Sequence, residues 1–210
     1  MSPLSVSGGT TGATRGSTKG DERRTALLAA LETHLREHDL DDINIADISR
    51  RAGVTRSAFY FYFDNKAAAV AALHEEMYAD GLEAVAMLGG DGTLREQIPT
   101  AVRAIMQGWS QRTHLYRAII DARAASPAVR DQWDAFQRSY ADLVADLITA
   151  ERAAGAAPDG PPAGALATAL LDLNDRTLER LVHLTSAPDL ESHCEVVVHI
   201  WLTSIYGSNA

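Results

Sequence analysis

Cysteine, aromatic residues and long apolar runs are all scarce in this sequence of 210 residues. The single cysteine, Cys194, allows no internal disulfide, which is the usage expected in the reducing cytoplasm. No uninterrupted run of about 18 apolar residues occurs, so we expect no membrane span. The first residues lack the apolar segment of a secretory signal peptide. Because 46 % of the residues are hydrophobic, the chain can still build one or two compact domains.

An excess of basic residues is also absent, since the formal net charge is −9. The net negative charge comes from residues 67–210. Residues 1–66 contain nine Lys and Arg against nine Asp and Glu, whereas residues 67–210 contain ten against nineteen. If any part of the protein contacts a polyanion, we expect it to be the N-terminal third.

The usual signatures of catalysis and metal binding are missing. No Gly-rich phosphate loop, nucleophile elbow or paired carboxylates can be identified. His193 and Cys194 are adjacent, so they point to different sides of a helix, and His199 follows His193 by six residues rather than three or four. We therefore predict no metal, no cofactor and no enzymatic activity.

Apolar residues recur at three- and four-residue spacing along most of the chain, which predicts an all-α fold of about nine helices. Residues 1–20 are rich in Gly, Ser and Thr and are expected to form a disordered tail. Residues 21–66 would form an N-terminal three-helix domain and residues 67–210 a larger helical domain. Beyond the first domain, helices are predicted over residues 65–88, 94–110, 113–124, 127–154, 165–185 and 190–206.

Two helix starts follow each other closely in the N-terminal domain. Asn44 is a suitable N-cap for a helix over residues 45–51, and Thr55 for a second helix over residues 55–61. Gly53 lies between them, where the first helix ends and the chain needs a positive φ. Two short helices joined by a tight turn form a helix-turn-helix.

Five consecutive aromatic residues, Phe59 to Phe63, end the second of these helices. We expect the Phe side chains to hold the three helices together and the Tyr hydroxyls to face outward, although all five rings could be core. Short polar residues at the start of the helix can reach base edges, and donors after it can bind phosphates. The candidate DNA-binding residues are Asn44, Thr55, Arg56, Ser57, Tyr60, Tyr62 and Lys66.

The segment INIADISRRAGVTRSAFYFYFDNKAAAV resembles the helix-turn-helix of the TetR family of bacterial transcriptional regulators. Ala52-Gly53-Val54, Tyr60, Tyr62-Phe63 and Lys66 occupy the places of the family motif. The resemblance implies an N-terminal domain that binds double-stranded operator DNA and a C-terminal domain for ligand binding and dimerisation. It implies a repressor that a small molecule releases from its operator.

Residues 67–210 contain all three tryptophans, each in a predicted helix. Large rings together with a single amide are typical of a small-molecule cavity, although ordinary core packing is the alternative for each tryptophan. In one TetR-family member that the segments AERAAGAAP, LATALLDLNDRT and VHIWLTSIYG resemble, matching positions line a hydrophobic pocket. The candidate ligand-binding residues are Trp109, Trp133, Phe136, Tyr140, Asn174 and Trp201, and we expect an uncharged, mostly apolar ligand.

The last two predicted helices are long and weakly charged, and the TetR resemblance implies that they form a homodimer through a four-helix bundle. A two-fold dimer also suits a palindromic DNA site. The sequence therefore predicts a cytoplasmic, dimeric, ligand-responsive repressor. The alternatives are an all-α enzyme or lipid carrier that uses the aromatic cavity, and a structural DNA-binding protein without a ligand.

Overall fold

The computed structural model describes residues 19–86, 92–183 and 189–207, so the predicted tail over residues 1–20 lies almost entirely outside the described residues. Within these ranges the chain forms nine α-helices, one short 3-10 helix and no strand. The predicted all-α fold is confirmed. None of the described helices is long and apolar enough to span a membrane.

The helices follow one another along the chain with short connections. In order they are α1 (Lys19–Leu35), the 3-10 helix η1 (Leu40–Asp42), α2 (Ile45–Arg51), α3 (Arg56–Tyr62), α4 (Lys66–Ala86), α5 (Leu94–Gln111), α6 (Thr113–Ala125), α7 (Pro127–Ala153), α8 (Ala163–Val182) and α9 (Leu190–Tyr206).

The predicted caps position the helix-turn-helix. The Asn44 side chain accepts from the Ala46 amide at 2.9 Å, and the Thr55 side chain accepts from the Ala58 amide at 3.2 Å. Gly53, in the turn between α2 and α3, has a φ of 68°, which a residue with a Cβ rarely adopts. Local hydrogen bonding therefore fixes where α2 and α3 begin, as expected from the sequence.

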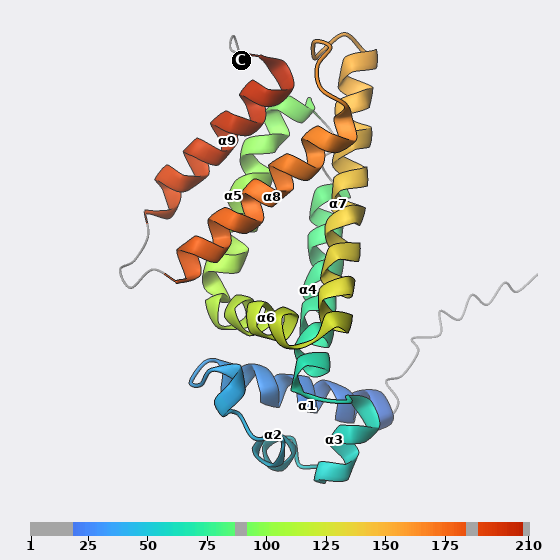
Figure 1. Ribbon diagram of the computed structural model, residues 1–210, viewed down its shortest axis with the longest axis vertical. Helices are drawn as coiled ribbons and strands as arrows, with labels where there is room; N and C mark the ends of the chain where they lie inside the picture. The colour runs from blue at the N-terminus through green and yellow to red at the C-terminus, as the bar shows by residue number, and fades with distance from the viewer. Residues whose placement is uncertain (1–18, 87–91, 184–188, 208–210) are drawn as a thin grey trace, which may run out of the picture.

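Helices α1, α2 and α3 form a head at one end of the molecule, and α4 to α9 form the body (Figure 1). Helix α4 starts in the head and continues into the body beside α7, while α6 crosses the base of the body next to α1. Helix α8 packs on α7, and α9 packs on α5. Two elements, α4 and α6, thus connect the head to the body.

The core runs continuously from the head into the body. Leu31 on α1, Ile48 on α2 and Phe59 on α3 are completely buried, and Val70 on α4 extends this core upward. Because buried apolar contacts resist separation, a shift of α4 would carry the head with it.

Candidate functional site

The N-terminal end of α3 exposes a group of hydrogen-bond donors. Thr55, Arg56 and Ser57 are all exposed. The Arg56 guanidinium lies over the Tyr60 ring, 5.7 Å from its centre, and donates to the Tyr60 hydroxyl at 3.3 Å. Thr55 is the N-cap of α3, and Arg56 and Ser57 are its first two residues. Helix α3 lies in the head, at the end of the molecule away from α5, α8 and α9 (Figure 1).

The run of five rings divides between the core and the surface. Phe59 and Phe63 are buried, as predicted, and Tyr60 is 45 % exposed. Tyr62 is half-buried against the head. Phe61 differs from the expectation that the Phe side chains face inward, because it is 81 % exposed. An α-helix turns about 100° per residue, so five consecutive positions cannot alternate as they would in a strand.

Asn44 and Lys66 have local structural tasks. Asn44 is exposed and caps α2. The Lys66 ammonium donates to three backbone carbonyls, those of Leu40 at 2.6 Å, Asp41 at 3.0 Å and Ile43 at 2.8 Å. These bonds use all three donors of an ammonium group and tie α4 to the end of η1. This role differs from the phosphate contact that the sequence predicts for Lys66.

Four of the six predicted ligand-binding residues meet at one place in the body, around His74 and Tyr78 of α4. The His74 ring centre lies 4.7 Å from that of Trp133, 6.0 Å from that of Trp109 and 5.2 Å from that of Phe136. The Tyr78 ring stacks on Phe136 at 4.0 Å, and the Tyr140 hydroxyl donates to the Tyr78 carbonyl at 3.3 Å. We call the rings of His74, Tyr78, Trp109, Tyr116, Trp133, Phe136 and Tyr140 the ring cluster.

Sequence reasoning missed His74 and Tyr78. Their spacing of four residues places both on the same side of α4, beside the apolar positions that mark its buried face. That spacing matches Phe136 and Tyr140 on α7, which are also four residues apart. The signal was present in the sequence, but only the packing of α4 against α7 joins the two pairs.

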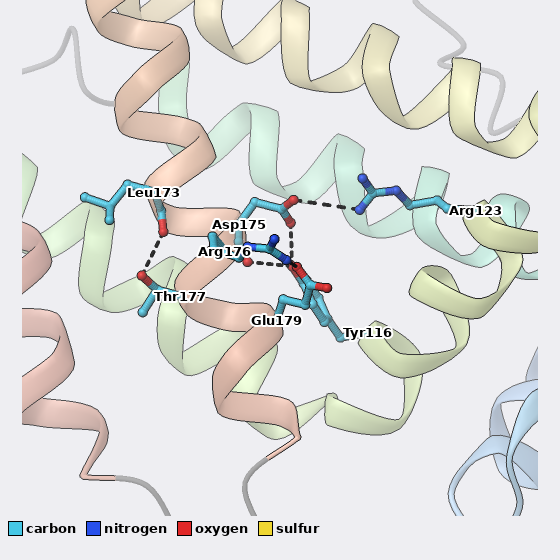
Figure 2. A network of polar contacts seen from close by, with 7 residues as sticks. All are labelled: Tyr116, Arg123, Leu173, Asp175, Arg176, Thr177 and Glu179. Atoms are coloured by element: carbon cyan, nitrogen blue, oxygen red, sulfur yellow. Dashed lines mark hydrogen bonds and ion pairs between the residues drawn. The ribbon is translucent and has the colours of Figure 1, made fainter.

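A polar network borders the ring cluster (Figure 2). The Tyr116 hydroxyl of α6 donates to the Asp175 side chain of α8 and lies 3.0 Å from the Asp175 carbonyl oxygen. Arg123 Nη1 lies 3.7 Å from Asp175 Oδ2, and the Arg123 guanidinium carbon lies 4.3 Å from the Trp133 ring centre. The network therefore places one cation and one carboxyl beside the rings.

Burial changes the proton affinities of this region. It lowers the pKa of His74 to about 4, with a smaller contribution from the positive charge of Arg123. Burial also raises the pKa of Asp175, although the Tyr116 hydrogen bond and Arg123 both oppose this shift. The imidazole is therefore neutral near pH 7.

Asn174 and Trp201 form a separate pair. Asn174 is 6 % exposed, and its Oδ1 accepts from Trp201 Nε1 at 3.1 Å. Within the described residues, no ring contact or hydrogen bond joins this pair to the ring cluster. The structure thus splits the six predicted residues into a cluster between α4, α5 and α7 and a link between α8 and α9.

The ring cluster is closely packed. A cavity of about 10 Å³, bordered by His74, Gln132 and Trp133 among others, has room for about one water molecule. A larger, polar crevice of about 380 Å³ lies between the end of α1 and α6. A ligand larger than water would have to part rings of the cluster.

The described residues contain no group of His, Cys, Asp and Glu side chains that could hold a metal ion. Cys194 is buried, whereas His193 and His199 are exposed. His193 Nδ1 lies 2.8 Å from the Asp189 carbonyl oxygen, at the start of its own helix.

A helix-turn-helix head joined to a helical body with an aromatic cluster is typical of one-component bacterial transcriptional regulators. Residues 27–73 match the family described as bacterial regulatory proteins, tetR family. Residues 98–207 match the family described as transcriptional regulator EthR, C-terminal domain. The chain belongs to the TetR family of transcriptional regulators.

Two curated relatives and one solved structure show the extent of the similarity. The chain is 36 % identical to HTH-type transcriptional regulator EthR of Mycobacterium tuberculosis over 194 residues, covering 90 % of this chain and 89 % of that one. It is 32 % identical to EthR of Mycolicibacterium smegmatis over 216 residues, covering 99 % and 97 %. FadR from Bacillus subtilis, solved in complex with stearoyl-CoA, has a TM-score of 0.74 at 16 % identity, covering 87 % and 99 %.

The curated relatives named above are regulators, so the chain is a transcriptional regulator and not an enzyme. The identity to FadR is too low to transfer a ligand, and that comparison shows the shared fold alone.

Proposed function

We propose that this regulator is a repressor that binds a two-fold operator as a homodimer and leaves it when a hydrophobic small molecule occupies the ring cluster. The observation that carries the proposal is the exposed N-terminal end of α3. The helix is anchored to the head by the buried side chains of Phe59 and Phe63. A helix presented in this way can enter a major groove, with Arg56 and Ser57 near base edges and Tyr60 and Tyr62 near phosphates. Such a protein acts on the chromosome, so we place it in the cytoplasm.

Dimerisation would occur through α8 and α9, which lie along one side of the body (Figure 1). Val196 of α9 is 58 % exposed, and Ile200, one turn further along the same face, is only partly covered in a single protomer. Pairing this surface with its two-fold mate would remove apolar area from water, which favours association.

The effector would act through α4, because this helix carries His74 and Tyr78 of the ring cluster and starts in the head. A ligand that separates Tyr78 from Phe136 would move α4 relative to α7. The head would follow through the core around Val70. Allosteric coupling free energies are typically about 1–3 kcal/mol, which corresponds to a roughly 5- to 150-fold change in operator affinity.

Selection of bound duplexes from a random pool tests the DNA-binding part of the proposal. We expect enrichment of a two-fold symmetric sequence whose half-sites lie about 34–36 Å apart. Arg56→Ala should weaken the enrichment, whereas Arg138→Ala, which changes an exposed arginine of α7, should retain it in full. A selected sequence without symmetry, or one that Arg56→Ala selects as strongly as the wild type, would contradict the proposal.

A further inference from the structure

We propose that the effector is an organic acid whose carboxylate binds the Arg123 guanidinium at the edge of the ring cluster, with His74 as a second donor. This inference rests on the proposed function, because it names the head group of the molecule that would occupy the ring cluster. The sequence led us to expect an uncharged ligand, because no charged residue was evident near the aromatic positions. The organic acid proposed here is a different expectation.

The Arg123 guanidinium has N–H groups that are available for a ligand. Its nearest carboxylate oxygen, Asp175 Oδ2, lies 3.7 Å from Nη1, which is an ion pair without a hydrogen bond. Within the described residues, no hydrogen bond from the guanidinium is found, and the side chain is 27 % exposed. A guanidinium has five N–H groups in a planar fork, the geometry that binds a carboxylate through two parallel hydrogen bonds.

Asp175 is a weak competitor for this fork. One of its oxygens accepts from the Tyr116 hydroxyl, which holds the carboxyl toward α6 (Figure 2). Burial raises the pKa of Asp175, so its charged form is less favoured than that of a carboxylate in water. An incoming carboxylate can therefore take the donors of Arg123 that Asp175 leaves unused.

His74 lies on the same tryptophan as Arg123. The Trp133 ring centre is 4.7 Å from the imidazole centre and 4.3 Å from the Arg123 guanidinium carbon. His74 also borders the cavity of about 10 Å³, together with Gln132. A neutral imidazole carries one N–H, which a carboxylate oxygen can accept.

When a carboxylate binds in this place, the His74 imidazole should take up a proton. The positive charge of Arg123 contributes to the low pKa of His74, and a bound anion would offset that charge. Arg123 is the charged group that acts on the imidazole. The other groups beside it are the rings of Trp109 on α5 and of Trp133 and Phe136 on α7, and Gln132 of α7, which borders the same small cavity. Affinity for the acid should consequently rise as the pH falls below neutrality.

A cationic ligand fits less well, although aromatic clusters often bind cations. The position over Trp133 that a ligand cation would use is already taken by the protein's own guanidinium. A second positive charge there would be repelled by Arg123. A neutral amide would meet no repulsion, but it would form only ordinary hydrogen bonds with the guanidinium.

Calorimetric titration with three ligands of the same ten-carbon chain tests the inference. Decanoate, decanamide and decylamine differ in the head group, which is anionic, neutral or cationic near pH 7. We expect decanoate to bind about 10- to 100-fold more tightly than decanamide, the ratio that charge-assisted hydrogen bonds support, and decylamine to bind most weakly. The protein should also take up protons when decanoate binds. This uptake is detected because the measured heat of binding then depends on the buffer.

Variants separate the head-group contact from the apolar contact. Arg123→Gln should abolish the preference for decanoate and lower decanamide affinity much less, because only ordinary hydrogen bonds to the amide are lost. Retained decanamide binding also shows that the variant is folded. Arg123→Lys should retain part of the preference. Arg138→Gln, which changes an exposed arginine on α7, should behave as wild type. His74→Asn should remove the proton uptake.

Two failures are distinguishable. If decanamide binds as tightly as decanoate and both displace DNA, the acid inference is wrong and the hydrophobic site of the proposed function stands. If none of the three ligands binds, the ring cluster is not the effector site, and both this inference and the effector part of the proposed function are wrong.

Discussion

Lys66 Nζ donates to the backbone carbonyl of Leu40 at 2.6 Å, across 26 positions of the chain. Together with the bonds to Asp41 and Ile43, this contact joins the first residue of α4 to the 3-10 helix that precedes the helix-turn-helix. Lys66 therefore ties the start of α4 to the segment between α1 and α2.

The first prediction concerns this contact. Lys66→Met keeps the length of the side chain but removes its donors, leaving three carbonyls without their partner. We expect the free energy of unfolding to fall by about 1.5–3 kcal/mol, the range for hydrogen bonds to a charged group. Urea denaturation measures this change.

Operator binding of Lys66→Met should weaken without a change in its salt dependence, because the ammonium would not be a phosphate ligand. A salt slope that falls by about one unit per subunit, with stability unchanged, would instead support a direct phosphate contact.

The second prediction concerns the buried pair of α8 and α9. Asn174→Ala leaves Trp201 Nε1 without its acceptor in a site where both residues are at most 6 % exposed. The loss of stability should be about 1–3 kcal/mol, the penalty for an unsatisfied buried group. Ligand affinity at the ring cluster should not change, because Asn174 lies outside it.

A double-mutant cycle with Trp201→Phe isolates the hydrogen bond from the packing. The sum of the two losses of stability in the single variants should exceed the loss in the double variant, because either change alone leaves one buried partner unpaired. Strict additivity would show that the hydrogen bond contributes nothing measurable.

The third prediction concerns pH. Burial among the rings lowers the pKa of His74 from an ordinary value of 6.5 to about 4. The folded protein thus favours the neutral imidazole, and this contribution is fully present above about pH 6.5 and is lost as the pH falls through about 4. The loss should reach about 3 kcal/mol.

His74→Phe keeps a ring in the cluster and removes the titration. Its stability should therefore fall less steeply than that of the wild type between about pH 6.5 and pH 4. His199→Gln, on the exposed side of α9, should follow the wild-type curve. Parallel curves for wild type and His74→Phe would show that His74 titrates as it does in water.

The helices of the head could be predicted closely because their limits depend on local interactions. Asn44 and Thr55 are caps whose hydrogen bonds reach only two or three residues along the chain. Gly53 provides the positive φ of the turn. The role of Lys66 could not be derived in this way, since its acceptors lie 23 to 26 positions away.

The candidate ligand site was only partly predictable. Helical spacing placed Trp133, Phe136 and Tyr140 on one side of α7, and the structure confirms that they meet the same helix, α4. His74 and Arg123 join them only through the packing of α4 and α6, which no local pattern specifies. For the same reason, Asn174 was grouped with the rings of α5 and α7, whereas the structure joins it to Trp201 of α9.

The fourth prediction concerns recognition of a two-fold operator by α3, in which Arg56 has the central part. This residue is exposed at the start of α3 and braced by Tyr60. Arg56→Ala should relax sequence preference by about 1–3 kcal/mol per half-site, as expected for an arginine that contacts a base.

The most direct measurement is fluorescence anisotropy of a labelled duplex carrying the selected operator, compared with a scrambled duplex at the same salt concentration. The wild type should bind the operator with two protomers per site and at least about a thousandfold more tightly than the scrambled duplex. Arg56→Ala should bring the two affinities closer together. Equal wild-type affinity for both duplexes would contradict the claim that α3 recognises an operator.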